Sequence, residues 1–163
     1  MSITFQGSVI MVKDVAVSRK FYEELLERKV LADFGPVIGY EGGLSIWQID
    51  HAYSILFNKK FDDGSAPGRK NMELCFEVND INPIWAEVSS KNIPLVHPLQ
   101  EQPWGQLVFR IYDPDGHIVE IGEAIPVFVA RFLSQGMSVQ QVAERTSVPE
   151  AAVRQIAESM NKT

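Results

Sequence analysis

Two glutamates on predicted strands are the residues best suited to do chemistry in this sequence. Glu73 precedes the apolar run at residues 74–76, and Glu120 lies between Val119 and Ile121. An unpaired carboxylate is costly to bury, so each glutamate either faces solvent on an alternating strand or contacts a ligand as an acid or base with a raised pKa. If both face one cavity, we expect them to share a proton and to titrate as a pair.

Four other side chains are candidates for binding a ligand: Trp47, Tyr53, Trp104 and Arg110. Aromatic residues on strands usually belong to a core, but rings that face a cleft suit a planar or apolar ligand. Trp104, which Gly105 follows, is the strongest candidate for lining a pocket. Arg110 alternates along a predicted strand, so it either faces solvent or meets an anionic group of the ligand.

The histidines and the cysteine are expected to be structural. His117 lies in a turn, where we expect it to bond local backbone, and His51 lies at another predicted turn. His97 precedes Pro98 and is expected in a solvent-exposed loop, with a contact at the rim of a cleft as the alternative. Cys75 is the only cysteine, which excludes an intrachain disulfide, and its apolar neighbours predict a buried, inert thiol.

The elements that must position these residues begin with a strand and a helix. The strand is predicted over residues 3–12, and Asp14 is placed to cap a helix over residues 15–27, whose apolar side chains recur at helical spacing. The next segment, punctuated by Gly and Pro, predicts three strands in a meander. Its apolar runs are residues 30–34, 37–41, 44–49 and 53–57.

A polar segment over residues 59–70 predicts a linker, after which the pattern starts again. Asp113-Pro114-Asp115-Gly116 is a strong signal for a tight turn, because Pro presets φ and Gly supplies a positive φ. The second half is expected to contain a strand over residues 71–78, a helix over 84–89, and strands over 93–97, 106–112 and 117–122.

The two halves also match each other in spacing. Residues 12–14 and 78–80, Val-Lys-Asp and Val-Asn-Asp, each close a strand and open a helix. Residues 30–57 span the same length as residues 93–120, which follow the second helix. A period of roughly 60 residues is too long for a solenoid repeat. It predicts an α+β fold of two βαβββ modules, whose curved mixed sheets face one another around a cleft.

The most specific sequence is Trp104-Gly105 followed by residues 109–120, which include the run Asp-Pro-Asp-Gly-His. Together with the turns at residues 12–14 and 76–80 and with Phe21-Tyr22, it resembles the vicinal oxygen chelate superfamily, which includes glyoxalase I, bleomycin-resistance proteins and extradiol dioxygenases. The resemblance covers residues 1–124, in modules of about 1–60 and 71–124, and leaves residues 125–163 as a helical extension.

This resemblance implies a divalent metal between the modules, held by His and Glu side chains on the first and last strands of each. Carried over by position, the four sites are Gly7, a residue near Phe57, Glu73 and Glu120. Gly7 and Phe57 cannot ligate a metal, whereas a catalytic site normally has three protein ligands and an open position. We therefore predict a degenerate site, with no cofactor or with a divalent metal, Mg²⁺ or Mn²⁺, bound weakly by the two carboxylates.

Residues 125–163 predict three short helices. They cover residues 126–135, 139–145 and 148–157, with Gly136 ending the first and Ser138 capping the second. The last two helices resemble a helix-turn-helix, but the second of them carries Glu150, Arg154 and Glu158 instead of a cationic stripe. Packing against the sheet domain or against a dimer partner is therefore expected in preference to DNA binding.

Charge and hydropathy limit the partners that the protein is expected to bind. A net charge of −6 without a Lys/Arg run disfavours nucleic acid as a partner. The sequence shows neither a secretory signal nor an apolar run of spanning length, which predicts a cytoplasmic protein without a membrane partner.

We expect a small-molecule-binding protein similar to the bleomycin-resistance branch. The superfamily resemblance also implies that the protein is a homodimer. Two alternatives stay open. One is a metal-dependent glyoxalase-type lyase or isomerase, or a dioxygenase, that acts on a small oxygenated substrate with Glu73 and Glu120 as catalytic residues. The other is a ligand-sensing DNA-binding regulator.

Overall fold

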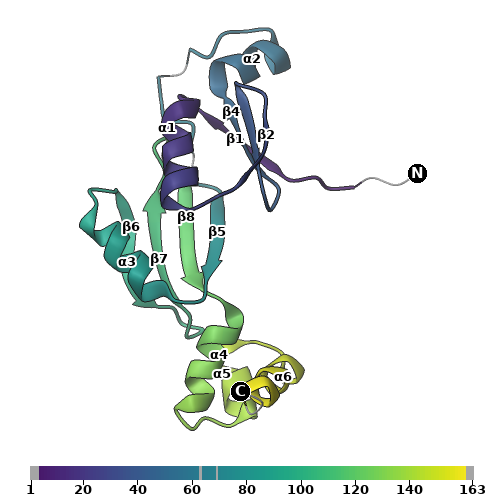
Figure 1. Cartoon of the computed structure of the whole chain (residues 1–163), viewed down its shortest axis with the longest axis vertical. Coiled ribbons are helices and arrows are strands. Elements are labelled where there is room, and N and C mark those ends of the chain that lie inside the picture. The colour runs from purple at the N-terminus through teal and green to yellow at the C-terminus, as the bar shows by residue number, and fades with distance from the viewer. Residues whose placement is uncertain (1–3, 63, 69, 161–163) are drawn as a thin grey trace. The chain divides into compact units, whose positions relative to one another are not determined.

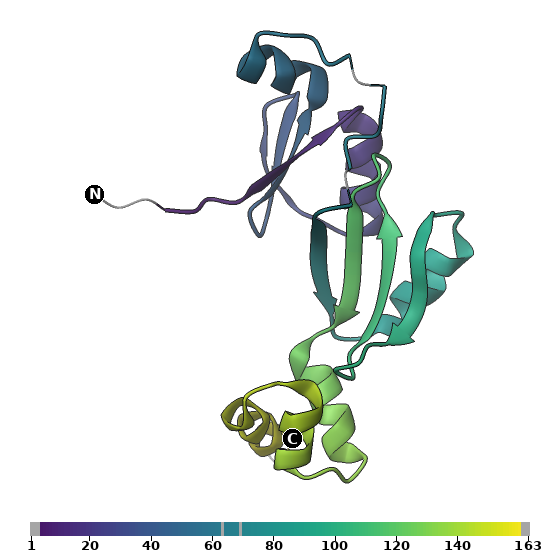
Figure 2. The ribbon, with the colours of Figure 1, turned by 180° about the vertical axis from the view of Figure 1, so that it is seen from behind.

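The computed structural model describes residues 4–62, 64–68 and 70–160, and the chain divides into two compact units. The first unit comprises Met1–Met72 and Asp113–His117, and the second comprises Glu73–Tyr112 and Ile118–Thr163. Each unit contains one four-stranded mixed sheet and its own helices (Figures 1 and 2). The predicted α+β class and the two βαβββ modules are confirmed.

The first unit follows the expected order of strand, helix and three strands. Its elements are β1 (Ser8–Val12), α1 (Val15–Arg19), the π-helical continuation η1 (Lys20–Leu25), β2 (Val30–Asp33), β3 (Val37–Tyr40) and β4 (Leu44–Gln48). The strand order is β1-β4-β3-β2, with β1 parallel to β4 and the other neighbours antiparallel. The first strand begins at Ser8, later than predicted, and the expected start at Ile3 lies outside the described residues.

Residues 53–57, which the sequence predicts as part of the meander, are helical instead. They belong to α2 (Ile49–Phe57), whose buried side chains Ile49 and Ala52 lie one helical turn apart. A short apolar run fits a strand and a buried helix equally well, so only tertiary packing decides between them. The last strand of the first module is therefore β4, and the assignment of a last-strand position near Phe57 is wrong.

An aspartate caps the helix that follows the first strand of each unit. Asp14 Oδ1 accepts hydrogen bonds from the backbone N–H groups of Ala16 and Val17, at 2.8 and 3.1 Å. Asp80 Oδ1 accepts from the N–H of Asn82 at 3.1 Å. Each carboxylate satisfies donors that the first turn of a helix leaves free, so the matching turns predicted at these positions have the same chemistry.

The second unit repeats the module. Its elements are β5 (Glu73–Val78), α3 (Ile81–Ser90), β6 (Leu95–Glu101), β7 (Leu107–Tyr112) and β8 (Ile118–Glu123), in the sheet order β5-β8-β7-β6. The helix α3 packs against one face, where the rings of Trp85 and Phe109 lie 5.2 Å apart (Figure 1). Because side chains alternate along a strand, Arg110 lies on the opposite face from Phe109.

A buried carboxylate organises the turn at Asp113–His117. Asp113 Oδ1 accepts from the backbone N–H groups of Asp115 and His117, at 3.0 and 2.8 Å, and Oδ2 accepts from the Tyr22 hydroxyl at 2.8 Å. Burial raises the pKa of Asp113, but hydrogen bonds from His117 and Tyr22 outweigh this effect and hold the pKa below its ordinary value. His117 thus bonds the Asp113 side chain, rather than local backbone as predicted.

The C-terminal extension folds as three helices around a small core of its own. These helices are α4 (Ile125–Ser134), α5 (Val139–Thr146) and α6 (Glu150–Met160). The buried side chains of this core are Phe128, Val129, Phe132, Val142 and Val153. Ser138 caps α5 as predicted, with Gln141 completing a reciprocal capping box. Across the described residues, no helix is both long and apolar enough to span a bilayer.

Charged contacts hold the extension against the second sheet. Arg131 Nη2 lies 2.7 Å from Glu123 Oε2, and the Glu123 side chain is only 6% exposed. The same carboxylate accepts the backbone N–H of Leu107 at 2.9 Å. Arg145 Nη2 lies 2.5 Å from Glu101 Oε1, and the guanidiniums of both arginines contact the Phe132 ring. We call Arg131, Glu123, Glu101 and Arg145 the latch.

We predict that Arg131→Met lowers the free energy of unfolding by about 1–3 kcal/mol, because it leaves the buried carboxylate of Glu123 without its cation. Urea denaturation measures the loss, and hydrogen exchange should speed up at the Leu107 amide. Arg154→Met is the matched control: its partner Glu150 is exposed, and such pairs contribute less than about 1 kcal/mol. Equal effects of the two substitutions would contradict the latch.

Candidate functional site

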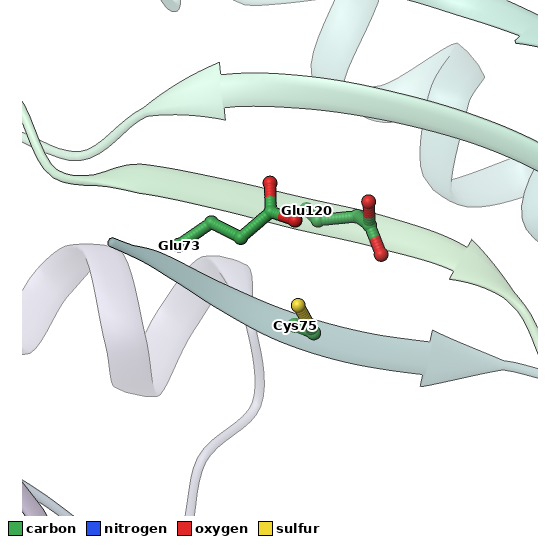
Figure 3. A group of neighbouring side chains, drawn as sticks. All are labelled: Glu73, Cys75 and Glu120. Atoms are coloured by element: carbon green, nitrogen blue, oxygen red, sulfur yellow. The ribbon is translucent and has the colours of Figure 1, made fainter. Parts of the chain in front are cut away.

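A row of polar side chains crosses all four strands of the second sheet, on the face opposite α3. The strand register sets Cys75 of β5 beside Glu120 of β8, Glu120 beside Arg110 of β7, and Arg110 beside His97 of β6. Glu73 precedes Cys75 by two residues and therefore shares its face. Figure 3 shows the carboxylates of Glu73 and Glu120 and the sulfur of Cys75 on one side of the two strands. We call these five residues the Arg110 cluster.

The guanidinium of Arg110 lies at the centre of the cluster and uses all three of its nitrogens. Its Nε donates to Glu73 Oε2 at 2.9 Å, and its Nη2 donates to Glu120 Oε2. Its Nη1 lies 2.9 Å from Nε2 of His97. The side chains of Arg110 and Glu120 are 17% and 13% exposed, whereas that of Glu73 is 37% exposed. Arg110 is therefore neither solvent-facing nor free.

The contacts of His97 define its tautomer. Its Nδ1 lies 2.8 Å from the carbonyl oxygen of Pro98, which can only accept, so Nδ1 carries the proton. Nε2 is then a lone-pair acceptor for Arg110. His97 lies on β6, in a stretch where the pairing with β7 shifts register, and not in the exposed loop that the sequence predicts.

The pKa values in the cluster reflect burial and charge together. Burial raises the pKa of Glu120, although the positive charge of Arg110 opposes the shift. Burial lowers the pKa of Arg110, but the hydrogen bond to Glu73 and the two carboxylate charges outweigh it and raise that pKa. Burial and the neighbouring glutamates raise the pKa of Cys75 to about 11. Cys75 is exposed, so the predicted buried position is wrong.

The cluster contains donor atoms that could hold a metal ion, but both of its carboxylates are already bonded to Arg110. One oxygen each of Glu73 and Glu120 and the sulfur of Cys75 lie within 4.8 Å of one another. Both carboxylates bond the guanidinium, so a divalent ion would have to displace a positive charge to bind them. The donor set therefore does not fit the metal that the superfamily resemblance implies.

The matching positions of the first module supply no metal ligands. Gly7 matches Glu73 by its distance from the capping aspartate. Ser45 matches Glu120, because Val9 pairs with Ser45 as Cys75 pairs with Glu120. A Cβ added at Gly7 would lie 2.0 Å from the carbonyl oxygen of Gly43. The space that a side chain would need at position 7 is thus filled by backbone.

The other predicted ligand-binding residues lie apart from the Arg110 cluster. Trp47 and Tyr53 belong to the first unit. The indole N–H of Trp47 donates to His51 Nδ1 at 2.8 Å, and Tyr53, a residue of α2, lines a pocket. Trp104 donates to Gln106 at 2.9 Å, in the turn before β7. Gly105 adopts φ +90° directly beneath the Phe132 ring, so this turn contacts the extension.

Cys75 and His97 belong to the cluster but are not among the residues predicted for the site. The spacing of Glu73 and Cys75 by two places them on one face of a strand, and this signal was available in the sequence. No comparable local signal identifies His97, because its place beside Arg110 depends on the irregular pairing of β6.

Comparison with known proteins identifies the family of the chain. A model of a family described as the glyoxalase-like domain matches residues 5–126. A protein of unknown function from Agrobacterium tumefaciens str. C58 is 35% identical, with 77% of this chain and 97% of that chain covered and a TM-score of 0.71. The superfamily resemblance is confirmed, and α5 and α6 lie beyond the matched residues. No curated protein matches the chain.

Two structures of lower identity share the fold. A glyoxalase-related enzyme from Fulvimarina pelagi is 21% identical, covering 74% of this chain and 88% of its own, with a TM-score of 0.61. A glyoxalase/bleomycin resistance protein/dioxygenase from Nocardioides is 16% identical, covering 76% and 85%, with a TM-score of 0.58.

We predict that Cys75 reacts slowly with iodoacetamide at neutral pH, despite its exposure, because a thiol with a pKa of about 11 holds little thiolate there. Glu120→Gln removes one of the charges that raise this pKa and should increase the rate several-fold at pH 8. Mass spectrometry of the alkylated protein follows a single site, since the chain has one cysteine. Glu87→Gln on α3 serves as control and should leave the rate unchanged; a fast wild-type reaction at pH 7 would contradict the prediction.

Proposed function

The chain belongs to the glyoxalase-like domain family, and we propose that it binds a small molecule at a site in which Arg110 replaces the divalent metal. The observation that carries the proposal is the bonding of one guanidinium to both glutamates that correspond to metal-ligand positions. A divalent ion needs carboxylate oxygens as ligands, and both carboxylates are already paired with Arg110.

The charge of the cluster limits the ligand. Glu73 and Glu120 oppose a single guanidinium, which leaves the cluster with excess negative charge when both glutamates are ionised. Arg110 is committed to those carboxylates and has little capacity left to bind an anion. The cluster therefore favours a neutral or cationic ligand that donates hydrogen bonds to Glu73, the more exposed of the two glutamates, over the anionic ligand considered from the sequence.

A metal-free enzyme that moves a proton is the second candidate. Glu120 favours it, since burial raises the pKa of this carboxyl toward the range in which general acid-base catalysis is efficient. Binding alone remains the first choice, because Glu120 is mostly covered and bonded to Arg110.

The homodimer and the absence of nucleic-acid partners remain predictions. Within residues 125–160, the basic side chains are Arg131, Arg145 and Arg154, and each forms an ion pair with a glutamate of the same chain. This pairing supports the second prediction, because phosphate binding would have to compete with those carboxylates.

We predict that Arg110→Ala creates a cation site where the wild-type protein has none. Removing the guanidinium frees two carboxylates beside the Cys75 sulfur, a donor set that suits Mn²⁺ or Zn²⁺. Protein purified without chelator or affinity metal is analysed for metal content, and its melting temperature is measured with each ion. A ligand that binds only the folded state at 100 times its Kd stabilises by about 2.7 kcal/mol, so the variant should melt several degrees higher with metal.

Arg110→Lys is the matched control, because it keeps the positive charge and should gain no metal. The wild-type protein should contain no stoichiometric metal and show no thermal shift. Stoichiometric metal in the wild type that disappears in Glu120→Gln would overturn the proposal and restore the metal-dependent enzyme.

A further inference from the structure

A second candidate binding site lies within the first unit and shares no residue with the Arg110 cluster. It is a pocket of about 490 Å³, within the size range of small-molecule sites. Its lining presents polar and apolar surface in nearly equal amounts, and the apolar side chains include Met11, Ile49, Tyr53, Phe61 and Met72. Asn71 and His117 have polar side chains. Such a lining suits a small aromatic molecule that also carries a hydrogen-bonding group.

The hydrogen bonds of His117 leave one of its ring nitrogens available to a ligand. Nδ1 lies 3.0 Å from Asp113 Oδ2 and 3.2 Å from Oδ1. Within the described residues, Nε2 has no hydrogen-bond partner, and His117 is one of the residues that line the pocket. The side chain is 10% exposed, so a ligand that fills the pocket is the natural partner for this nitrogen.

Asp113 determines which nitrogen carries the proton. Its side chain is fully buried and accepts hydrogen bonds from Tyr22 and from two backbone N–H groups, an arrangement that favours the ionised carboxylate. An ionised carboxylate can only accept, so when His117 is neutral its Nδ1 is the protonated nitrogen. Nε2 of the neutral imidazole then presents a lone pair that can accept a hydrogen bond from a ligand.

We propose that this pocket binds a small phenol-like ligand, with the aromatic ring against the apolar wall and the hydroxyl group donating to Nε2 of His117. A hydroxyl donor complements the lone pair, and a planar ring complements Tyr53 and Phe61. Binding forms a hydrogen bond and changes no covalent bond. The site is independent of the Arg110 cluster, so each can be tested without the other.

The test titrates the full chain with 2-naphthol and with its methyl ether, which has the same ring system but no hydroxyl donor. Isothermal titration calorimetry should show wild-type protein binding 2-naphthol about tenfold more tightly than the ether, the factor expected for one hydrogen bond of about 1.4 kcal/mol. In His117→Asn, an amide can still donate to Asp113, but the Nε2 acceptor is gone. This variant should lose the tenfold preference and bind both compounds with similar affinity.

A second variant and a spectroscopic measurement keep the test independent of folding defects. Met72→Trp, at a residue that is 46% exposed, should fill the pocket and weaken both ligands. Nitrogen-15 chemical shifts of His117 in the free protein should show protonated Nδ1 and unprotonated Nε2. The proposal is overturned by a protonated Nε2, by equal wild-type affinities for the two compounds, by unchanged binding in Met72→Trp, or by no binding of 2-naphthol.

Discussion

A guanidinium that is largely removed from water must be neutralised, and on the second sheet Arg110 imposes this requirement on the strands around it. An unpaired buried charge costs several kcal/mol, and Glu120, the less exposed of the two glutamates, pairs with the guanidinium while Glu73 adds a second ion pair on the same face. A slip of one residue in β8 would send Glu120 to the face that α3 covers and would leave Arg110 without that partner. The ion pairs of Arg110 therefore form only when β5, β7 and β8 pair in their observed register.

The same condition explains why this glyoxalase-like site differs from a metal centre. In a metal site, two carboxylates are neutralised by a divalent ion from solution, whereas here both pair with one positively charged side chain of the chain itself. The charge is present as soon as the sheet forms and needs no cofactor. Glu120 is covered by this arrangement, and Glu73 remains accessible at the edge strand, where a ligand can still reach it.

The two modules show how one scaffold carries different chemistry. Both open their helices with a capping aspartate and both place a parallel pair of strands at the same point of the sheet. In the first module, however, backbone at Gly43 fills the space beside Gly7, and no ionisable side chain stands at either matching position. The polar centre of the first unit is instead the buried carboxylate of Asp113, which the β7–β8 turn of the second module supplies. Local turn chemistry is thus shared, while the polar centres lie in different places.

The extension uses its basic residues to attach and fold itself. Arg131 and Arg145 face carboxylates of the second sheet, and both contact the ring of Phe132. Gly105 allows that ring to approach the backbone of the turn before β7, since any side chain there would clash with it. The likeness to a helix-turn-helix is therefore limited to the order of the helices, because Arg131 and Arg145 form ion pairs within the protein.

The sequence by itself determined the repeated strand-helix-strand order, the capping aspartates, the tight turn at Asp113 and the three helices of the extension. These features depend on side-chain periodicity and on hydrogen bonds between residues close together in the chain, so they can be read locally. It failed for residues 53–57, where a short apolar run has no period of its own, and for Cys75, whose apolar neighbours belong to the other face.

Tertiary structure alone decided the contacts of Arg110. From the sequence, Arg110 could face solvent or a ligand, and His97 was expected in a loop. Strand pairing instead sets Arg110 beside Glu120 and His97 beside Arg110. Register is a relation between strands distant in the chain, and it is selected by the burial of whole faces rather than by any single residue. The pairing of charges follows from that selection, which is why the sequence identified the glutamates and Arg110 as candidates but did not predict that they pair with one another.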